Sequence, residues 1–208
     1  KGDRGVCYPF QYGYDLDGKM RIRFMPVRVV NLQLAGDKPM LAYIAEEVTA
    51  IMTELGIDCD QTCMDCTGMQ GMIADTIEQR VVGTMTRIYF GGSVNAEIQV
   101  SAIDTRSGKD AYKNRVTQLM GHMAQYVKSG MVREFDQEAA RELCMRQLVE
   151  KVSPQRIESK DDYKARHGYS PDISDAALVA TAFLREKKGI MPDGSRAVDP
   201  SMIGAAHK

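Results

Sequence analysis

Residues 61–80 read QTCMDCTGMQGMIADTIEQR, and this stretch decides the fold. Its first five residues, ending at Asp65, are a short segment that predicts a buried strand. A Thr-Gly loop follows, and residues 71–80 have the pattern of a helix. Residues 84–90 then alternate like a second strand before a Gly-Gly pair. A strand, a helix and another strand in succession are typical of an α/β layer fold.

The sequence before this stretch predicts a β-hairpin and one helix. Residues 4–12 and 20–32 are rich in β-branched and aromatic residues and flank a turn-like Asp-Leu-Asp-Gly at 15–18. Asp37 is the expected N-cap of a helix whose apolar residues recur at three-and-four spacing over 41–55. We therefore expect the hairpin to form part of the same sheet as the two later strands.

The remaining elements complete a mixed β-sheet flanked by α-helices. We expect two helices, a short strand and a last helix, over residues 112–128, 136–150, 153–158 and 170–189. Together they predict one domain over residues 1–190, followed by a loosely structured tail at 191–208. One domain is also the ordinary expectation for 208 residues with 44% hydrophobic content.

Bulk properties exclude several classes of protein. The net charge of −1 gives no general sign of nucleic-acid binding, so any affinity for DNA must come from local patches. No apolar run approaches the ~18 residues of a membrane span, and from the first residues we expect no leader peptide. Five mostly clustered cysteines fit a reducing compartment, with the cytoplasm as the simplest reading. A start at Lys-Gly-Asp is expected of a domain taken from a longer protein.

Two groups of carboxylates are candidates for chemistry. Asp65 ends the predicted strand, where ligand-binding groups gather in α/β sheets. Asp172 and Asp175 are three residues apart in the first turn of the last helix, so they share one face. Carboxylate oxygens suit Mg²⁺ or Mn²⁺, and two such ions about 3.5–4 Å apart support phosphodiester hydrolysis. The alternatives are a turn cap for Asp65 and simple helix-dipole stabilisation for the other two residues.

The cysteines offer a competing site. Cys59, Cys63 and Cys66 have the spacing of the iron–sulfur loop in radical S-adenosylmethionine enzymes. The predicted strand, however, places Cys63 and Cys66 on opposite faces, and no fourth ligand for zinc is evident. Small buried packing thiols are the simpler interpretation.

Basic residues next to the last helix are candidates for binding phosphates. They include Lys160, Lys164 and Arg166, although neighbouring acids make a solvated charged surface an equal alternative. Asn114 and Arg115 either contact DNA or simply start a helix. The chain has no Gly-x₄-Gly-Lys-Ser/Thr loop, so we expect no ATP hydrolysis from it.

Several segments resemble the large terminase subunits of tailed bacteriophages, in the order of that family. The longest is RIESKDDYKARHGYSPDISDA at 156–176. MDCTGMQG at 64–71 resembles the family's Asp-x-Thr-Gly-x-Gly element, and YKNR at 112–115 resembles its Tyr-x-Asn-Arg segment. The opening Gly-Asp-Arg at 2–4 resembles the end of a Gly-Asp loop.

This resemblance implies a ribonuclease H-like nuclease domain that cuts concatemeric double-stranded viral DNA during genome packaging. By position, Asp65 and Asp175 would bind two Mg²⁺ or Mn²⁺ ions, and Asp172 would be an accessory ligand or support one. The family has another catalytic Asp on a strand that precedes Gly2, outside this chain. Asp3 could take its place, although a position beside the site fits it better.

The resemblance also implies partners and a location. They are double-stranded DNA, the portal protein, the small terminase subunit and an N-terminal ATPase domain of the parent chain, with no membrane. The protein would work in the host cytoplasm, transiently at the procapsid portal. The alternative functions are a cellular ribonuclease H-like nuclease, such as a junction resolvase, and a docking module for portal or DNA that does not cut.

Overall fold

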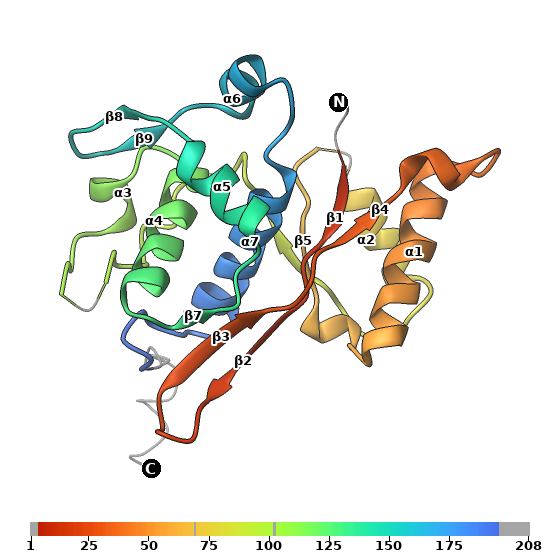
Figure 1. Cartoon of the computed structure of the whole chain (residues 1–208), viewed down its shortest axis with the longest axis horizontal. Helices are drawn as coiled ribbons and strands as arrows, with labels where there is room; N and C mark the ends of the chain where they lie inside the picture. Colours follow the sequence, from red (N-terminus) through yellow and green to blue (C-terminus); the bar gives the residue numbers. More distant parts are fainter. Residues whose placement is uncertain (1–3, 69, 102, 196–208) are drawn as a thin grey trace, which may run out of the picture.

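The computed structural model describes residues 4–68, 70–101 and 103–195 (Figure 1). Its first feature is the expected hairpin, in which each arm is interrupted once. The first arm is β1 (Gly5–Cys7) and β2 (Phe10–Tyr14), and the second is β3 (Met20–Phe24) and β4 (Arg28–Val30). The interruptions contain Pro9 and Pro26, and proline has no N–H to give to a ladder.

Strand pairing extends the hairpin in one direction and leaves a second pair apart from it. β1 pairs with β4 and β2 with β3, both antiparallel, and β7 (Val132–Arg133) runs parallel to β3. β5 (Cys63–Asp65) and β6 (Thr86–Ile88) form a separate parallel pair. The strands are therefore of mixed direction, as predicted, but within the described residues the hairpin strands and the β5–β6 pair do not join into the one sheet that we expected.

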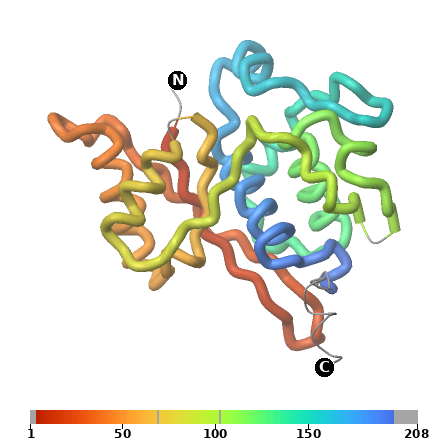
Figure 2. Tube along the Cα trace, turned by 180° about the vertical axis from the view of Figure 1, so that it is seen from behind, coloured from red at the N-terminus to blue at the C-terminus, as the bar shows by residue number. Residues whose placement is uncertain are grey.

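Helices cover the strands on two sides (Figures 1 and 2). On one side lie α1 (Met40–Leu55) and α2 (Gln70–Glu78), which pack on each other and on the β5 side of the strands. On the other side lie α4 (Arg115–Lys128), α5 (Gln137–Met145) and α7 (Asp172–Ala182), which continues into a π-helical turn at Phe183–Lys187. α7 contacts both β1 and β5, so it spans the two groups of strands.

Apolar side chains form one core on each side of the strands. Ile22 and Phe24 of β3 pack with the small and aliphatic residues of α7, including Leu178. Ala45 of α1 and Ala74 of α2 are fully buried in the second core. This two-sided burial explains why Cys63 and Met64, which are neighbours in β5, are both apolar, since each packs against a different core.

The structure differs from the expected elements in two places. Pro39, rather than Asp37, is the N-cap of α1. The helix expected over 136–150 ends at Met145, because the chain then turns into β8 (Leu148–Glu150), which pairs with β9 (Arg156–Ile157). Tertiary strand pairing here overrides a local helical pattern.

Two short helices also went unpredicted. α3 (Gly108–Ala111) precedes α4. α6 (Lys160–His167) begins with a capping box between Ser159 and Asp162 and ends at Gly168, whose φ of 74° suits glycine. The sequence contains the capping signal, but the residues of α6 are mostly charged and form no apolar stripe that would indicate a helix.

The end of the domain is well packed. Ile190 is fully buried, and its carbonyl accepts a hydrogen bond from the Tyr126 hydroxyl at 2.6 Å. Residues 191–195 close a turn, while residues 196–208, most of the expected loose tail, lie outside the described residues. Within the described part of the chain, no helix is both long and apolar enough to cross a membrane.

Acid sensitivity should arise from His122, which is fully buried in α4 with no hydrogen-bond partner on either ring nitrogen. Burial, together with Arg185 and Arg115 nearby, lowers the pKa of His122 to about 3. The unfolded chain binds this proton first, so stability is complete above pH 6.5 and is lost as the pH falls toward 3.

We therefore expect the free energy of unfolding to fall between pH 7 and 4.5 by about 2–3 kcal/mol more in the wild type than in His122→Met. Urea unfolding at the two pH values measures this difference. Parallel losses in the two proteins would show that His122 does not carry the effect.

Candidate active site

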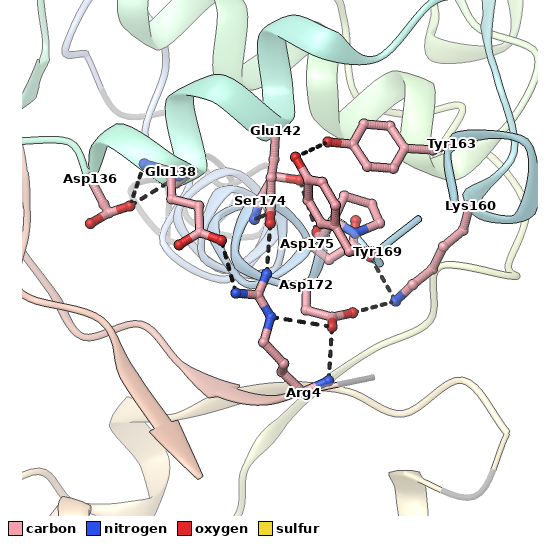
Figure 3. A network of polar contacts seen from close by, with 12 residues as sticks. Arg4, Asp136, Glu138, Glu142, Lys160, Tyr163, Tyr169, Asp172, Ser174 and Asp175 are labelled. Carbon is pink, nitrogen blue, oxygen red and sulfur yellow. Dashed lines mark hydrogen bonds and ion pairs between the residues drawn. The ribbon is translucent and has the colours of Figure 1, made fainter. Parts of the chain in front are cut away.

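The site lies at the start of α7, where the chain brings acids and cations together (Figure 3). Asp172 and Asp175 occupy the first turn of this helix, as expected from their spacing. The unpaired N–H groups of a first helical turn favour negative charge there. Ala176, Val179 and Ala180 continue the same face and, with the two acids, line one cavity.

Asp172 is held by two basic partners. Its Oδ2 accepts a hydrogen bond from the backbone N–H of Arg4 at 2.8 Å, and its Oδ1 accepts one from Lys160 Nζ at 2.9 Å. The Arg4 guanidinium lies 3.8 Å from the same carboxylate. Because only 7% of the Asp172 side chain is exposed, these contacts fix its position.

Asp175 is paired with a buried arginine. Its Oδ1 accepts a hydrogen bond from Arg146 at 2.5 Å, and its Oδ2 lies 3.1 Å from Lys160 Nζ. Burial raises the pKa of Asp175, while Arg146 and Lys160 act in the opposite direction. The side chain of Lys160 is 45% exposed, so it is the partner that can move away most easily.

Asp65 reaches the same cavity from the end of β5. Its Oδ1 accepts hydrogen bonds from the Thr67 backbone N–H at 3.0 Å and from Thr67 Oγ1 at 2.6 Å. Thr67 Oγ1 in turn accepts from the Phe90 N–H at 2.8 Å. Asp65 therefore caps its turn. The contacts with Thr67 also orient the Asp65 carboxylate, which lines the cavity.

The hydroxyl group of Thr67 is expected to contribute strongly to the stability of the fold. In Thr67→Val the Asp65 oxygen and the Phe90 N–H both lose a partner, which should lower the free energy of unfolding by about 1–3 kcal/mol. Thr67→Ser keeps the hydroxyl and is the matched control, with a much smaller loss. Urea unfolding compares the two variants, and equal losses would mean that the hydroxyl contributes no more to stability than the methyl group does.

The donor set suits a hard divalent cation, but its members are not gathered around one point. Asp65, Asp172 and Asp175 provide carboxylate oxygens to one cavity. Within residues 4–68, 70–101 and 103–195, no three His, Cys, Asp or Glu side chains are placed to hold a metal ion together. The three acids therefore suit a metal ion because their oxygens are of the right chemical type and because they line the same cavity. Basic side chains hold two of them, Asp172 and Asp175.

Sequence reasoning missed several residues that shape this site. Glu142 of α5 is fully buried, accepts a 2.7 Å hydrogen bond from the Ser174 N–H, and pairs with Arg4 at 2.8 Å. Arg4 also bonds Glu138 at 2.9 Å, and so links β1 to α5 and α7. An isolated acid or arginine on a helix gives no local signal of burial, so only the packing reveals Glu142 and Arg146.

The predicted DNA-contacting residues have different surroundings. Lys160 lies at the acids, and Arg166 forms a 2.5 Å ion pair with Glu158. Asn114 caps α4 by accepting from the Thr117 N–H, and Arg115, only 6% exposed, pairs with Gln118 and Glu186. These internal contacts favour the helix-start interpretation for the last two residues. Lys164 lies on α6 with Lys160 and Arg166, whereas Asp3 lies outside the described residues.

The cysteines pack on two sides of β5. Cys63 lies against the core that contains α7, whereas Cys59 and Cys66 are buried in the core that contains α1 and α2. Burial raises the pKa of Cys63 to about 12 and also raises that of the other two thiols. Thiols on opposite faces that resist ionisation fit packing better than an iron–sulfur cluster.

Solved structures resemble this arrangement. The nuclease domain of the large terminase subunit gp2 of bacterial virus Sf6 superposes with a TM-score of 0.58 over 87% of this chain and 89% of that one, at 15% identity. The fold is that of a terminase nuclease domain. A mutant of the same domain, solved with manganese and beta-thujaplicinol, gives 0.57 over 85% and 87%, again at 15% identity. No protein-family model and no curated protein matches the chain by sequence.

The predicted fold is therefore confirmed. The chain has the ribonuclease H-like α/β architecture of the terminase nuclease domain, over nearly the whole length of both chains. At 15% identity the likeness concerns the arrangement of strands and helices, and the roles of individual side chains rest on the geometry above.

Proposed function

We propose that this chain is a metal-dependent endonuclease domain that cuts concatemeric double-stranded viral DNA during genome packaging. The observation that carries the proposal is the shared cavity: Asp65 from a strand end and Asp172 and Asp175 from a helix start all line it, on a terminase nuclease fold. The structure of the mutant Sf6 gp2 nuclease domain with manganese supports a divalent cation, Mg²⁺ or Mn²⁺, as the cofactor.

In this proposal Asp65 and Asp175 hold the metal, two ions in all, and Asp172 assists as an outer ligand. Bound there, the ions would activate water and stabilise the departing 3′ oxygen of the cut strand. Thr67 orients Asp65, and the α7 amides favour the charge of Asp175. Rigid positioning of this kind is what a catalytic carboxylate requires.

The cations beside the acids have two roles. Arg4 and Arg146 balance buried negative charge, because their side chains are mostly buried and hydrogen-bonded to the acids or to Glu142. Lys160 is exposed at the cavity, and with Lys164 and Arg166 on α6 it would face the DNA backbone. Phosphate contacts of this kind give binding with little base preference.

One observation favours a second candidate, a docking module that binds portal or DNA without cutting. The oxygens of Asp172 and Asp175 already have basic partners, and within the described residues no group of three acids is placed to hold a metal ion. A docking module predicts that substitution of these acids leaves metal binding and cleavage unaffected. The terminase likeness leads us to prefer the packaging enzyme to a cellular junction resolvase.

The wider setting is part of the proposal. Its partners would be the portal protein, the small terminase subunit and an ATPase domain in the same parent chain, and its place the host cytoplasm at the procapsid portal. Purification of the parent complex and identification of its subunits would test these partners.

Metal binding separates the two candidates. Titration calorimetry with Mn²⁺ should give binding to the wild type that is lost in Asp65→Ala and Asp175→Ala and kept in Asp161→Ala, an exposed acid on α6. Equal heats in all four proteins would favour the docking module and would contradict the proposed site.

A further inference from the structure

Helix α7 takes its N-terminal cap from another helix. Its N-cap residue is Pro171, whose side chain cannot accept a hydrogen bond from the first turn. The N–H of Ser174, the third residue of the helix, instead donates to Glu142 Oε2 of α5 at 2.7 Å. The caps of α4, α5 and α6 are their own N-cap residues, Asn114, Asp136 and Ser159. Glu142 therefore does for α7 what a local side chain does for these helices.

The same carboxylate is tied to the start of β1. Glu142 Oε1 pairs with the Arg4 guanidinium at 2.8 Å, and Arg4 lies directly before β1. The backbone N–H of Arg4 also bonds Asp172 of α7 at 2.8 Å (Figure 3). Because the side chain of Glu142 is fully buried, its two oxygens are held at these partners. One buried side chain thus joins α5, α7 and the beginning of β1.

The capped amide lies between the two acids of the candidate site. Ser174 stands between Asp172 and Asp175 in the first turn of α7. Free N–H groups of a first turn attract carboxylates, and an aspartate of that turn can bond to them itself. Because Glu142 takes up the Ser174 N–H, this donor does not draw the two aspartates back onto the helix. Both carboxylates instead bond to Lys160, the partner that is exposed and can move away.

We propose that Glu142 is a positioning residue of the active site. Its carboxylate caps α7 from α5, and so keeps Asp172 and Asp175 directed toward the divalent cation. The inference rests on the proposed function, because it concerns the same metal site. Glu142 is fully buried, so it acts through the first turn of α7 rather than by contact with the metal or with DNA.

Removal of the Glu142 carboxylate should weaken metal binding. Glu142→Leu has a similar volume and removes both oxygens, and its Kd for Mn²⁺ in titration calorimetry should rise at least about fivefold. Glu142→Gln keeps an oxygen that can accept from Ser174, and it should recover most of the affinity. Arg4 is 27% exposed and keeps its bond to Glu138 in both variants, so neither variant leaves a buried charge unpaired.

Two further variants separate the cap from the ion pair. Glu138→Gln changes the other carboxylate that bonds Arg4, at 2.9 Å, and should bind Mn²⁺ like the wild type. Pro171→Ser, added to Glu142→Leu, gives α7 an N-cap hydroxyl of its own and should restore both folding and Mn²⁺ affinity. A role through the Glu142–Arg4 pair alone predicts a different pattern, in which Glu142→Gln is as weak as Glu142→Leu and Pro171→Ser restores nothing.

Hydrogen exchange measures the cap without a metal. In the 208-residue protein, the Ser174 amide should exchange at least about fivefold faster in Glu142→Leu than in the wild type or Glu142→Gln, while amides of α4 stay unchanged. A folded Glu142→Leu protein with the wild-type exchange rate at Ser174, or with the wild-type Mn²⁺ affinity, would overturn the inference. A Glu142→Leu protein that stays unfolded after Pro171→Ser is added would overturn it too.

The same experiments distinguish this inference from the proposed function. A wild-type protein that binds no Mn²⁺ contradicts the proposed metal site, whatever the variants do. Exchange at Ser174 then still decides whether Glu142 caps α7. Mn²⁺ binding by the wild type that Glu142→Leu leaves unchanged supports the proposed function and overturns the positioning role of Glu142.

Discussion

Asp175→Asn is expected to lower the rate of plasmid cleavage by at least about 10²-fold. In the proposed site Asp175 is a metal ligand, and a bound metal supplies several kcal/mol of charge stabilisation, each 1.36 kcal/mol being a factor of ten. The amide keeps the shape of the side chain but loses the charge that a hard cation needs. Initial rates of nicking, measured with excess Mn²⁺, give the ratio.

Two controls make this result specific. Asp161→Asn removes one acid from the exposed face of α6 and should cleave at the wild-type rate. Circular dichroism of Asp175→Asn should match that of the wild type, so that lost activity is not lost folding. A folded Asp175→Asn protein with full activity would remove Asp175 from the metal site.

Arg146→Leu is expected to destabilise the fold by about 3–5 kcal/mol. Only 2% of the Arg146 side chain and 13% of the Asp175 side chain are exposed, so removal of the arginine leaves a buried carboxylate with a lost partner. Lys160 compensates in part, which places the expected loss toward the lower end of that range. Urea unfolding measures the change.

A surface ion pair provides the comparison for Arg146. Arg23 and Glu134 are about half exposed or more, so Arg23→Leu should cost less than about 1 kcal/mol. In Arg146→Leu/Asp175→Leu the carboxylate is gone, and much of the lost stability should return. A loss under 1 kcal/mol in Arg146→Leu alone would show that the pair is not structurally important.

The fold was largely predictable because its signals are local. The hairpin, α1, β5, α2 and α7 each follow from periodicity and from turn or capping residues over one short stretch. The end of α5 was not predictable in this way, since β8 forms through pairing with β9 rather than through its own residues. Whether a segment follows its local helical pattern or pairs with a distant strand depends on the packing of the whole fold.

The site was predictable to a smaller extent. Asp172 and Asp175 share a helix face by spacing alone, and a strand-end position drew attention to Asp65. Their approach to one cavity depends on the contact of α7 with β5 and β1, which no local pattern contains. Arg146 and Glu142 were missed for the same reason. The role of a buried charged residue depends on the groups that pack beside it, and these are distant in the sequence.

The most direct measurement of the central claim is cleavage of supercoiled plasmid in Mn²⁺ and in EDTA. It should use the 208-residue protein. We expect nicked and linear DNA in Mn²⁺ and intact plasmid in EDTA. Intact plasmid in Mn²⁺, or equal cleavage in EDTA, would contradict the assignment of a metal-dependent nuclease.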